Sequence, residues 1–290
     1  METAILILQL IVDGLLVGLP YALIAIGLTL IWGVMDIINF AHGEFLVVGM
    51  YVGYWTYALL GVSPVLSLPV AILLLGALGW VTYRYAIARV LKSENLLSQI
   101  VVTFGVSVFL QNVFLFLFSG DYRSISQEPW IKGDLMIQGI FLSIPELVIS
   151  MISLLIILLM HLFIRRTNTG KAIVATALDR ETAQLMGIDT DRMNSLTFTI
   201  GIGCLGVAGV LLPITTHVSP YSGFLFGVLA FTIVALGGFG SIIGTMFAGI
   251  MVGLVQSFGG FLVAPAYKYL CVFILYLLIL GIRPRGLFGW

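Results

Sequence analysis

Charge is scarce in this sequence. Asp, Glu, Lys and Arg make up only 9% of the 290 residues, and the net charge is zero, which excludes the basic footprint of a nucleic-acid-binding protein. Hydrophobic residues make up 60% of the chain, whereas soluble domains contain about 45–50%. A soluble protein of this size could not keep so much apolar surface from water. The composition therefore predicts an integral membrane protein that is polytopic almost from end to end.

Cysteine is rare in this sequence, and the N-terminus lacks basic residues. The two cysteines, Cys204 and Cys271, lie in apolar runs, and we interpret them as packing residues and not as a disulfide or a metal site. The first ten residues, METAILILQL, contain no Lys or Arg and no small-residue cleavage site. We therefore expect a first membrane span there and not a removable signal peptide.

An energy source of its own is absent as well. The only Gly-Lys pair, Gly170-Lys171, is followed by Ala172 where a nucleotide-binding loop has Ser or Thr, and Arg165 replaces the earlier glycine. Buried carboxylates, which proton- or sodium-driven carriers normally need, are nearly absent too. Asp13 alone lies well inside an apolar run, and a structural role is favoured for it. We expect no catalytic residue, no cofactor and no metal site.

Apolar runs of about 20 residues, enough to cross a bilayer as a helix, recur along the chain. The clear candidates lie at about 41–60, 64–83, 100–118, 142–164, 195–216 and 266–282. The run 223–258 is too long for one span, and the turn LGGFGS at 236–241 divides it. Residues 4–35 are expected to form one tilted span, followed by a short broken or re-entrant piece near Asp36. The prediction is an all-α polytopic bundle of eight or nine spans, in one transmembrane domain over residues 1–290.

Positive charge orients this bundle. Ten of the thirteen Lys and Arg residues lie in the segments 84–99 and 165–193 and in the tail after the last span. The other three, Arg123, Lys132 and Lys268, fall on the opposite side. Because short loops rich in Lys and Arg stay in the cytoplasm, we predict a cytoplasmic C-terminus, a cytoplasmic loop at 165–193 and an outward loop at 119–140.

The segment 165–193 is the largest polar island in the chain. Residues from Lys171 to Met186 favour a single helix that ends at Gly187, a natural C-terminal cap. Small alanines would keep this helix slim enough to seat in a groove, and a transporter without its own ATPase needs a contact for one. From these residues alone two interpretations stay open: a docking helix for a separate ATPase, or an ordinary solvated loop.

Glycine is abundant, at 33 residues, and often recurs four residues apart, as in Gly14/Gly18 and Gly249/Gly253. In membranes this spacing favours close packing of helices. A second role, breaking a helix or lining a path, has its candidates in the turn region at Gly237, Gly238, Gly240 and Gly244. Glycine-broken turns in 27–45 and in 235–249 fall one in each half, which indicates an internal repeat.

Three runs carry a family resemblance: GLTLIWGVMDIINFAHGEF at 27–45, TGKAIVATALDRETAQLMGIDTDR at 169–192 and LGGFGSIIGTMFAG at 236–249. They resemble the inner-membrane permeases of bacterial ABC importers for branched-chain amino acids, in particular the shorter of the two permease partners. The resemblance implies a subunit that forms a translocation path for leucine, isoleucine and valine with a second related permease. Two cytoplasmic ATPases, a periplasmic substrate-binding protein and the surrounding membrane lipid are its other implied partners.

The resemblance also assigns residues. The family's ATPase-coupling loop maps to Gly170, Lys171, Ala175, Ala177, Asp179, Ala183, Gly187 and Asp189. The fit to the usual Glu-Ala-Ala consensus is loose, because Thr176 separates Ala175 from Ala177. The family's N-terminal motif maps to Asn39, Ala41, His42, Gly43 and Glu44. We expect this motif to begin a helix on the cytoplasmic side, with Glu44 favoured by the positive end of the helix.

The substrate and the outward loop leave alternatives open. No residue here is assigned to substrate, and the same kind of permease could carry urea, short amides or other amino acids. A self-sufficient ion-coupled carrier or channel is a further alternative. The outward loop combines Tyr122 and Trp130 with Arg123 and Lys132. It is either a docking rim for the binding protein or a hairpin that merely joins two spans.

Overall fold

The computed structural model describes residues 2–91, 95–125, 133–137, 139–283 and 286–288. The helices are α1 (Glu2–Met35), α2 (His42–Leu60), α3 (Leu68–Thr82), α4 (Ala88–Leu91), α5 (Leu96–Phe118), α6 (Ile144–Arg166), α7 (Asn168–Leu178), α8 (Arg180–Leu185), α9 (Thr190–Leu211), α10 (Ser222–Gly237), α11 (Ile242–Leu262) and α12 (Lys268–Ile282). A π-helical stretch, Tyr83–Ile87, joins α3 to α4. One hairpin pairs β1 (Asp134–Ile137) with β2 (Ile140–Ser143) in antiparallel register.

The predicted all-α polytopic bundle is confirmed, but the number of spans differs. Among the described residues, seven helices are long and apolar enough to cross a membrane: α1, α3 with its continuation through α4, α5, α6, α9, α11 and α12. The expected eight or nine spans are therefore only approximately matched. The difference lies in α2 and in α10, which is only 16 residues long, because neither is among these seven helices.

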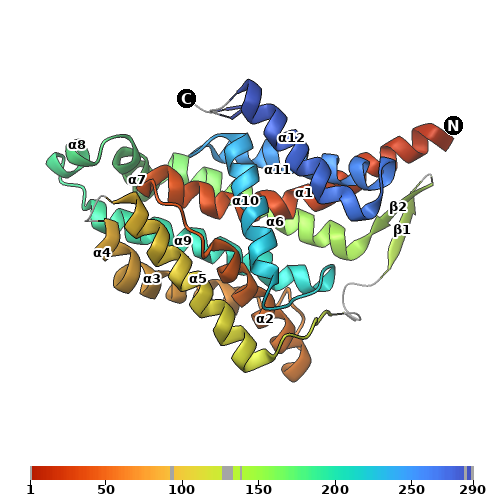
Figure 1. Ribbon diagram of the computed structural model, residues 1–290, viewed down its shortest axis with the longest axis horizontal. Helices are drawn as coiled ribbons and strands as arrows, with labels where there is room; N and C mark the ends of the chain where they lie inside the picture. The colour runs from red at the N-terminus through yellow and green to blue at the C-terminus, as the bar shows by residue number, and fades with distance from the viewer. Residues whose placement is uncertain (1, 92–94, 126–132, 138, 284–285, 289–290) are drawn as a thin grey trace.

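The bundle has two distinct ends, visible in Figure 1. The N-terminus and the β1–β2 hairpin lie at one end, here called the hairpin end, where Gln9 Nε2 donates to the Phe141 carbonyl at 2.9 Å. Helices α7 and α8 lie at the other end, here called the loop end. The C-terminal segment is also held there, because the Leu287 amide donates to the Leu236 carbonyl at 2.8 Å. The first and the last of the described residues therefore lie toward opposite ends.

Helix α1 forms the core of the bundle, and glycine lets its neighbours approach. Its central residues are fully buried. A Cβ added at Gly18 would lie 2.8 Å from the Gly249 carbonyl oxygen on α11, and one added at Gly27 would lie 2.5 Å from the Gly201 carbonyl oxygen on α9. Lipid offers no hydrophobic drive between helices, so such backbone contacts, rich in dispersion, hold the bundle together.

Two units of the chain have the same plan. Helix α1 is followed by an irregular segment and the short helix α2, and α9 is followed by an irregular segment and the short helix α10. The two long helices meet at Gly27 and Gly201, and the two short helices meet at Gly43 and Gly223. The counterpart of 27–45 is thus the end of α9 with the start of α10. The turn in 235–249 instead joins the end of the short helix α10 to α11 at the loop end, so the sequence-based pairing of 27–45 with 235–249 does not match this plan.

Candidate functional site

The segment after α1 returns into the bundle and starts α2 at depth. Helix α1 ends at Met35, and Asp36 takes a positive φ of 53°, which reverses the chain. Helix α2 begins at His42, whose Nε2 lies 2.9 Å from the Ile24 carbonyl oxygen. Ile24 precedes the end of α1 by eleven residues, or about 16 Å of helix. The expected helix start is present, but it lies near the middle of α1 and not at the loop-end surface.

Helix α10 begins at the same depth, and its first turn touches that of α2. A Cβ on Gly43 would overlap the Gly223 carbonyl oxygen, and a Cβ on Gly223 would lie 2.6 Å from the carboxyl atoms of Glu44. The N-termini of two helices therefore meet here, each with unsatisfied N–H groups and a partial positive charge. The Glu44 carboxyl group, lying against the start of α10, compensates this charge. We call this contact the half-helix junction.

Polar groups gather at the junction without enough partners. Asn39, His42 and Glu44 are 1%, 0% and 3% exposed. The Asn39 side-chain oxygen accepts from the Ala41 amide at 3.1 Å. Three buried atoms, Asn39 Nδ2, His42 Nδ1 and Glu44 Oε2, have no hydrogen-bond partner among the described residues. Buried polar groups within a membrane bundle are costly and mark functional positions.

The buried acid that sequence reasoning sought is Glu44 and not Asp13. Asp13 lies toward the hairpin end of α1, is partly exposed, and accepts from Gln9 Nε2 at 2.7 Å. The sequence predicts Glu44 at the end of a span, because it predicts that the helix containing Glu44 begins at the membrane surface. The length of 4–35, too great for one straight span, and the polar start of the following run are the signals that could have located it.

An aromatic cluster separates the junction from the loop end. The rings of Trp32 and Phe239 stack at 4.5 Å, Phe231 lies 6.3 Å from Trp32, and Phe40 lies 5.7 Å from Phe231. Beyond this cluster lies a cavity of about 530 Å³, bounded by the end of α1, by α7 and by the turn between α10 and α11. Its walls include both Trp32 and Val174, so α7 and the aromatic cluster share one cavity.

The turn between α10 and α11 contains the four glycines singled out in the sequence. Gly238 and Gly240 have positive φ angles of 93° and 79°, a conformation that glycine adopts without strain. Gly237 and Gly244 lie backbone against backbone across the turn, and a Cβ on Gly33 would lie 2.7 Å from the Gly240 Cα. Gly240 lines the cavity. Gly237 and Gly244 therefore serve close packing and Gly238 serves the turn, while a path-lining role for these glycines stays a prediction.

The predicted coupling helix is two helices. Asp179 is extended, with φ −156° and ψ 107°, and separates α7 from α8. Its Oδ1 accepts from the Thr182 amide at 3.0 Å, which makes it the N-cap of α8. Hydrogen bonds from Thr182 hold the pKa of Asp179 below its usual value. Asp competes with the helix for backbone N–H groups, and this local preference, missed in the sequence, divides the segment 171–186.

The other residues assigned to the coupling loop shape the same unit. Gly187 has φ 82°, and the Ile188 amide donates to the Ala183 carbonyl at 3.0 Å, as in a glycine C-cap. Gly170 lies directly on the last turn of α6, where a side chain would strike the backbone. Asp189 caps α9 by accepting from the Arg192 amide at 3.0 Å. Lys171 and Ala177 are exposed, and Ala175 is partly buried.

Three large apolar side chains stand exposed on this polar unit. Leu178, Leu185 and Met186 are 83%, 87% and 78% exposed. Figure 1 shows α8 projecting beyond the bundle at the loop end. We call these three residues the apolar tip. Exposed apolar residues grouped on a polar segment are characteristic of an interaction surface.

The segment predicted to be an outward loop is held to the bundle by Arg123. The guanidinium carbon lies 4.9 Å from the Trp55 ring centre, and the group donates to the Phe118 carbonyl at 2.9 Å. The Arg123 backbone also pairs with Val218. Tyr122, in contrast, is 76% exposed. Trp130 and Lys132 lie outside the described residues.

Comparison with known proteins places this architecture in a family. The family model for the permease component of branched-chain amino acid transport systems matches residues 10–280. The high-affinity branched-chain amino acid transport system permease protein BraD of Pseudomonas aeruginosa is 35% identical to this chain. The match covers 97% of this chain and 95% of BraD. The permease protein LivH of Escherichia coli is 35% identical, and the match covers 99% of this chain and 97% of LivH. The probable branched-chain amino acid transport permease protein LivH of Methanocaldococcus jannaschii is 28% identical, and the match covers 92% of this chain and 88% of that protein. The chain belongs to the permease family of branched-chain amino acid transport systems.

Proposed function

We propose that this chain is the shorter membrane permease of an ATP-driven importer for branched-chain amino acids. Relatives named as high-affinity permeases for these substrates, matched at 35% identity along nearly the whole chain, carry this proposal. They favour it over urea, amides or other cargo. The transporter also needs a second permease, two ATPases and a substrate-binding protein, and this chain supplies transport and not catalysis.

The loop end faces the cytoplasm in this proposal. Of the ten Lys and Arg residues that the structure describes, eight lie at the loop end, and only Arg123 and Lys268 lie at the hairpin end. Such an excess of Lys and Arg favours the cytoplasmic side. The C-terminus is then cytoplasmic, and the hairpin end receives the binding protein.

The ATPase docks on α7 and α8 through the apolar tip. Leu178, Leu185 and Met186 project from the bundle, where a groove on a partner can enclose them. Asp179 and Gly187 are caps that shape the unit, so they act by positioning this tip. Changing either cap would alter the fold of α8 as well as the contact, which makes the tip residues the cleaner probes.

Movement of α7 reaches the half-helix junction through the aromatic cluster. Val174 on α7 and Trp32 on α1 border one cavity, and Trp32 contacts Phe239 and Phe231. Phe231 in turn contacts Phe40, two residues before His42. This continuous set of packed rings supports a gate at the junction, opened and closed by the ATPases.

The second permease covers the face that carries the junction. Phe40 is 44% and Phe224 is 75% exposed, and both flank the first turns of α2 and α10. Figure 1 shows α10 on the viewer's face, between α5 and α12. A partner on this face would place the translocation path between two subunits, next to Glu44 and His42.

Reconstitution in liposomes tests the proposal. With the partner permease, the ATPases, internal ATP and external binding protein, labelled leucine should accumulate and should continue to do so when ion gradients are collapsed. This chain alone should transport nothing under a proton or sodium gradient. Asp13→Asn should leave ATP-driven uptake mostly intact, because the side chain of Asp13 accepts its hydrogen bond from Gln9 on its own helix. Gradient-driven uptake by the chain alone, abolished by Asp13→Asn or Glu44→Gln, would replace the importer with a self-sufficient carrier.

A further inference from the structure

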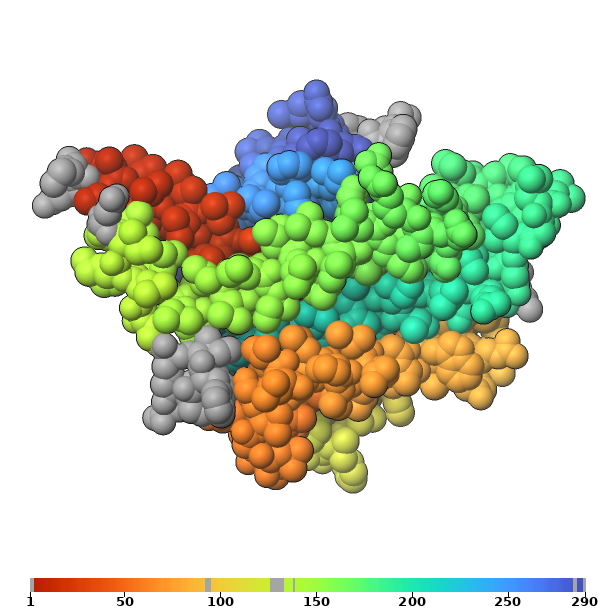
Figure 2. Space-filling model, turned by 180° about the vertical axis from the view of Figure 1, so that it is seen from behind, coloured from red at the N-terminus to blue at the C-terminus, as the bar shows by residue number. Residues whose placement is uncertain are grey.

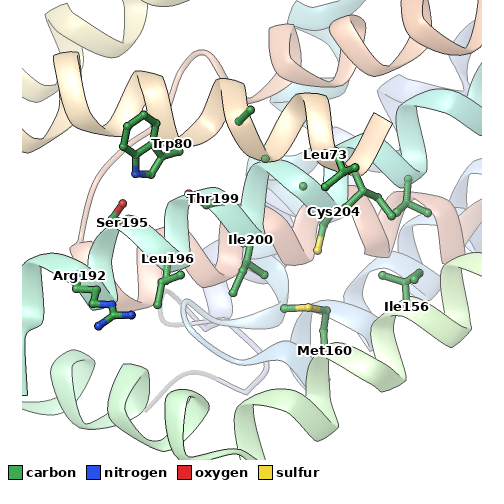
Figure 3. Close-up of a pocket in the computed structure, with 15 residues that line it drawn as sticks. Leu73, Trp80, Ile156, Met160, Arg192, Ser195, Leu196, Thr199, Ile200 and Cys204 are labelled. Carbon is green, nitrogen blue, oxygen red and sulfur yellow. The ribbon is translucent and has the colours of Figure 1, made fainter. Parts of the chain in front are cut away.

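A groove runs along the face opposite the half-helix junction. Helices α3 and α6 form its walls and α9 forms its floor, and its volume is about 700 Å³. Figure 2 shows this face, with α9 visible between α6 and α3. The floor stays open because Gly203 and Cys204 are small, and the sulfur of Cys204 points into the space (Figure 3). The groove lies apart from the junction and from the apolar tip.

The groove is as long as one leaflet of a bilayer. The part of its floor beyond the polar residues Arg192 and Ser195 extends along α9 from Leu196 to Val207, about 16 Å at helical rise. Half of the hydrocarbon thickness of a membrane is about 15 Å. A transmembrane helix from a partner would need a groove of twice this length. The dimensions therefore suit an acyl chain of the leaflet at the loop end.

Polar groups are found only at the loop end of the groove. Arg192 and Ser195 lie in the first turns of α9, and Figure 3 shows the Arg192 guanidinium directed toward α6. No Asp or Glu lines the groove, and no ion pair with another described residue engages Arg192. One turn deeper, the buried Thr199 hydroxyl has no partner among the described residues. The order from the loop end is cation, hydroxyls and then an apolar channel.

We propose that this groove binds one anionic glycerophospholipid. The phosphate pairs with Arg192 and Ser195, and an acyl chain fills the channel as far as Val207. Charge decides the class of lipid, because a basic pocket between membrane helices favours anionic headgroups over zwitterionic ones. Bound in this way, the lipid braces α3 against α6, which directly precedes the α7–α8 unit.

The test is native mass spectrometry of the delipidated full-length chain in mild detergent, with phosphatidylglycerol or phosphatidylcholine added back. The unchanged chain should retain one phosphatidylglycerol in preference to phosphatidylcholine. Arg192→Gln should reduce this preference about fivefold. Arg180→Gln removes a loop-end charge outside the groove and should leave the preference unchanged.

A second variant separates binding from charge. A Cβ on Gly203 would meet only the Ile72 carbonyl oxygen, at 4.0 Å, so Gly203→Leu should fold while filling the channel. It should abolish retention of both lipids. Equal retention of the two lipids by the unchanged chain, or full retention by Gly203→Leu, would overturn the proposal. So would a crosslink from a photoreactive residue at position 160 to a partner permease, since a protein would then occupy the groove.

Discussion

The half-helix junction makes the sharpest prediction, through Gly43→Ala. The added Cβ would overlap the Gly223 carbonyl oxygen, and would lie 2.7 Å from its carbon and 2.9 Å from the Gly227 amide nitrogen. All three atoms belong to the α10 backbone. No side-chain rotation can relieve the contact, so α2 and α10 must separate.

The cost follows from overpacking. An extra carbon atom in a packed core costs about 1–3 kcal/mol of stability. Because the added Cβ would strike backbone atoms that cannot rotate away, we expect a cost of about 3 kcal/mol, at the upper end of this range. For a chain of this size the apparent Tm should fall by about 6–12 °C, at about 2–4 °C for each kcal/mol. Leucine uptake should fall with it, because the junction would be held apart.

The assay is thermal unfolding of the purified protein followed by tryptophan fluorescence, with uptake measured in parallel. Gly105→Ala is the matched control, because Gly105 also lies in a membrane helix, α5, and a Cβ there would meet nothing within 4 Å. Both variants gain the same helix propensity, so their difference isolates the clash. A Gly43→Ala protein with the Tm and uptake of the control would refute the junction.

A double-mutant cycle checks the same contact from the other side. A Cβ on Gly223 meets the Glu44 carboxyl group and not backbone, so Gly223→Ala should be relieved when Glu44→Ala removes that group. The double variant should be less destabilised than the sum of the single variants by about 1 kcal/mol or more. Strict additivity would show that the two residues do not touch.

Two further predictions concern the two ends of the bundle. Leu185→Glu should weaken ATPase binding tenfold or more (about 2 kcal/mol for a hot-spot residue) and leave the Tm unchanged. The control Glu181→Gln should change neither the binding nor the Tm. Normal ATPase stimulation in Leu185→Glu would contradict docking at the tip. Arg123→Ala should lower the stability by about 0.5–2 kcal/mol through loss of its ring contacts, while Tyr122→Ala should keep the Tm and reduce uptake at limiting binding protein. Equal uptake by Tyr122→Ala and the unchanged chain would leave the loop without a docking role.

Features set by short stretches of sequence were predicted well. Apolar runs of sufficient length identify membrane helices, because the bilayer imposes that length on any span. The break at 236–241 and the cap at Gly187 were found because glycine takes left-handed backbone angles that other residues avoid. The break at Asp179 was equally local, but helix propensity summed over 171–186 concealed it.

The depth at which a helix begins was decided by tertiary structure alone. Hydropathy is the same for a segment that starts at the membrane surface and for one that starts halfway, so 41–60 resembled an ordinary span. Only the packing of Gly43 on Gly223 places Glu44 at the centre, and only burial by neighbouring helices separates Glu44 from Asp13. Contacts between residues about 180 positions apart have no local signature, because composition records what a segment is made of and not what covers it.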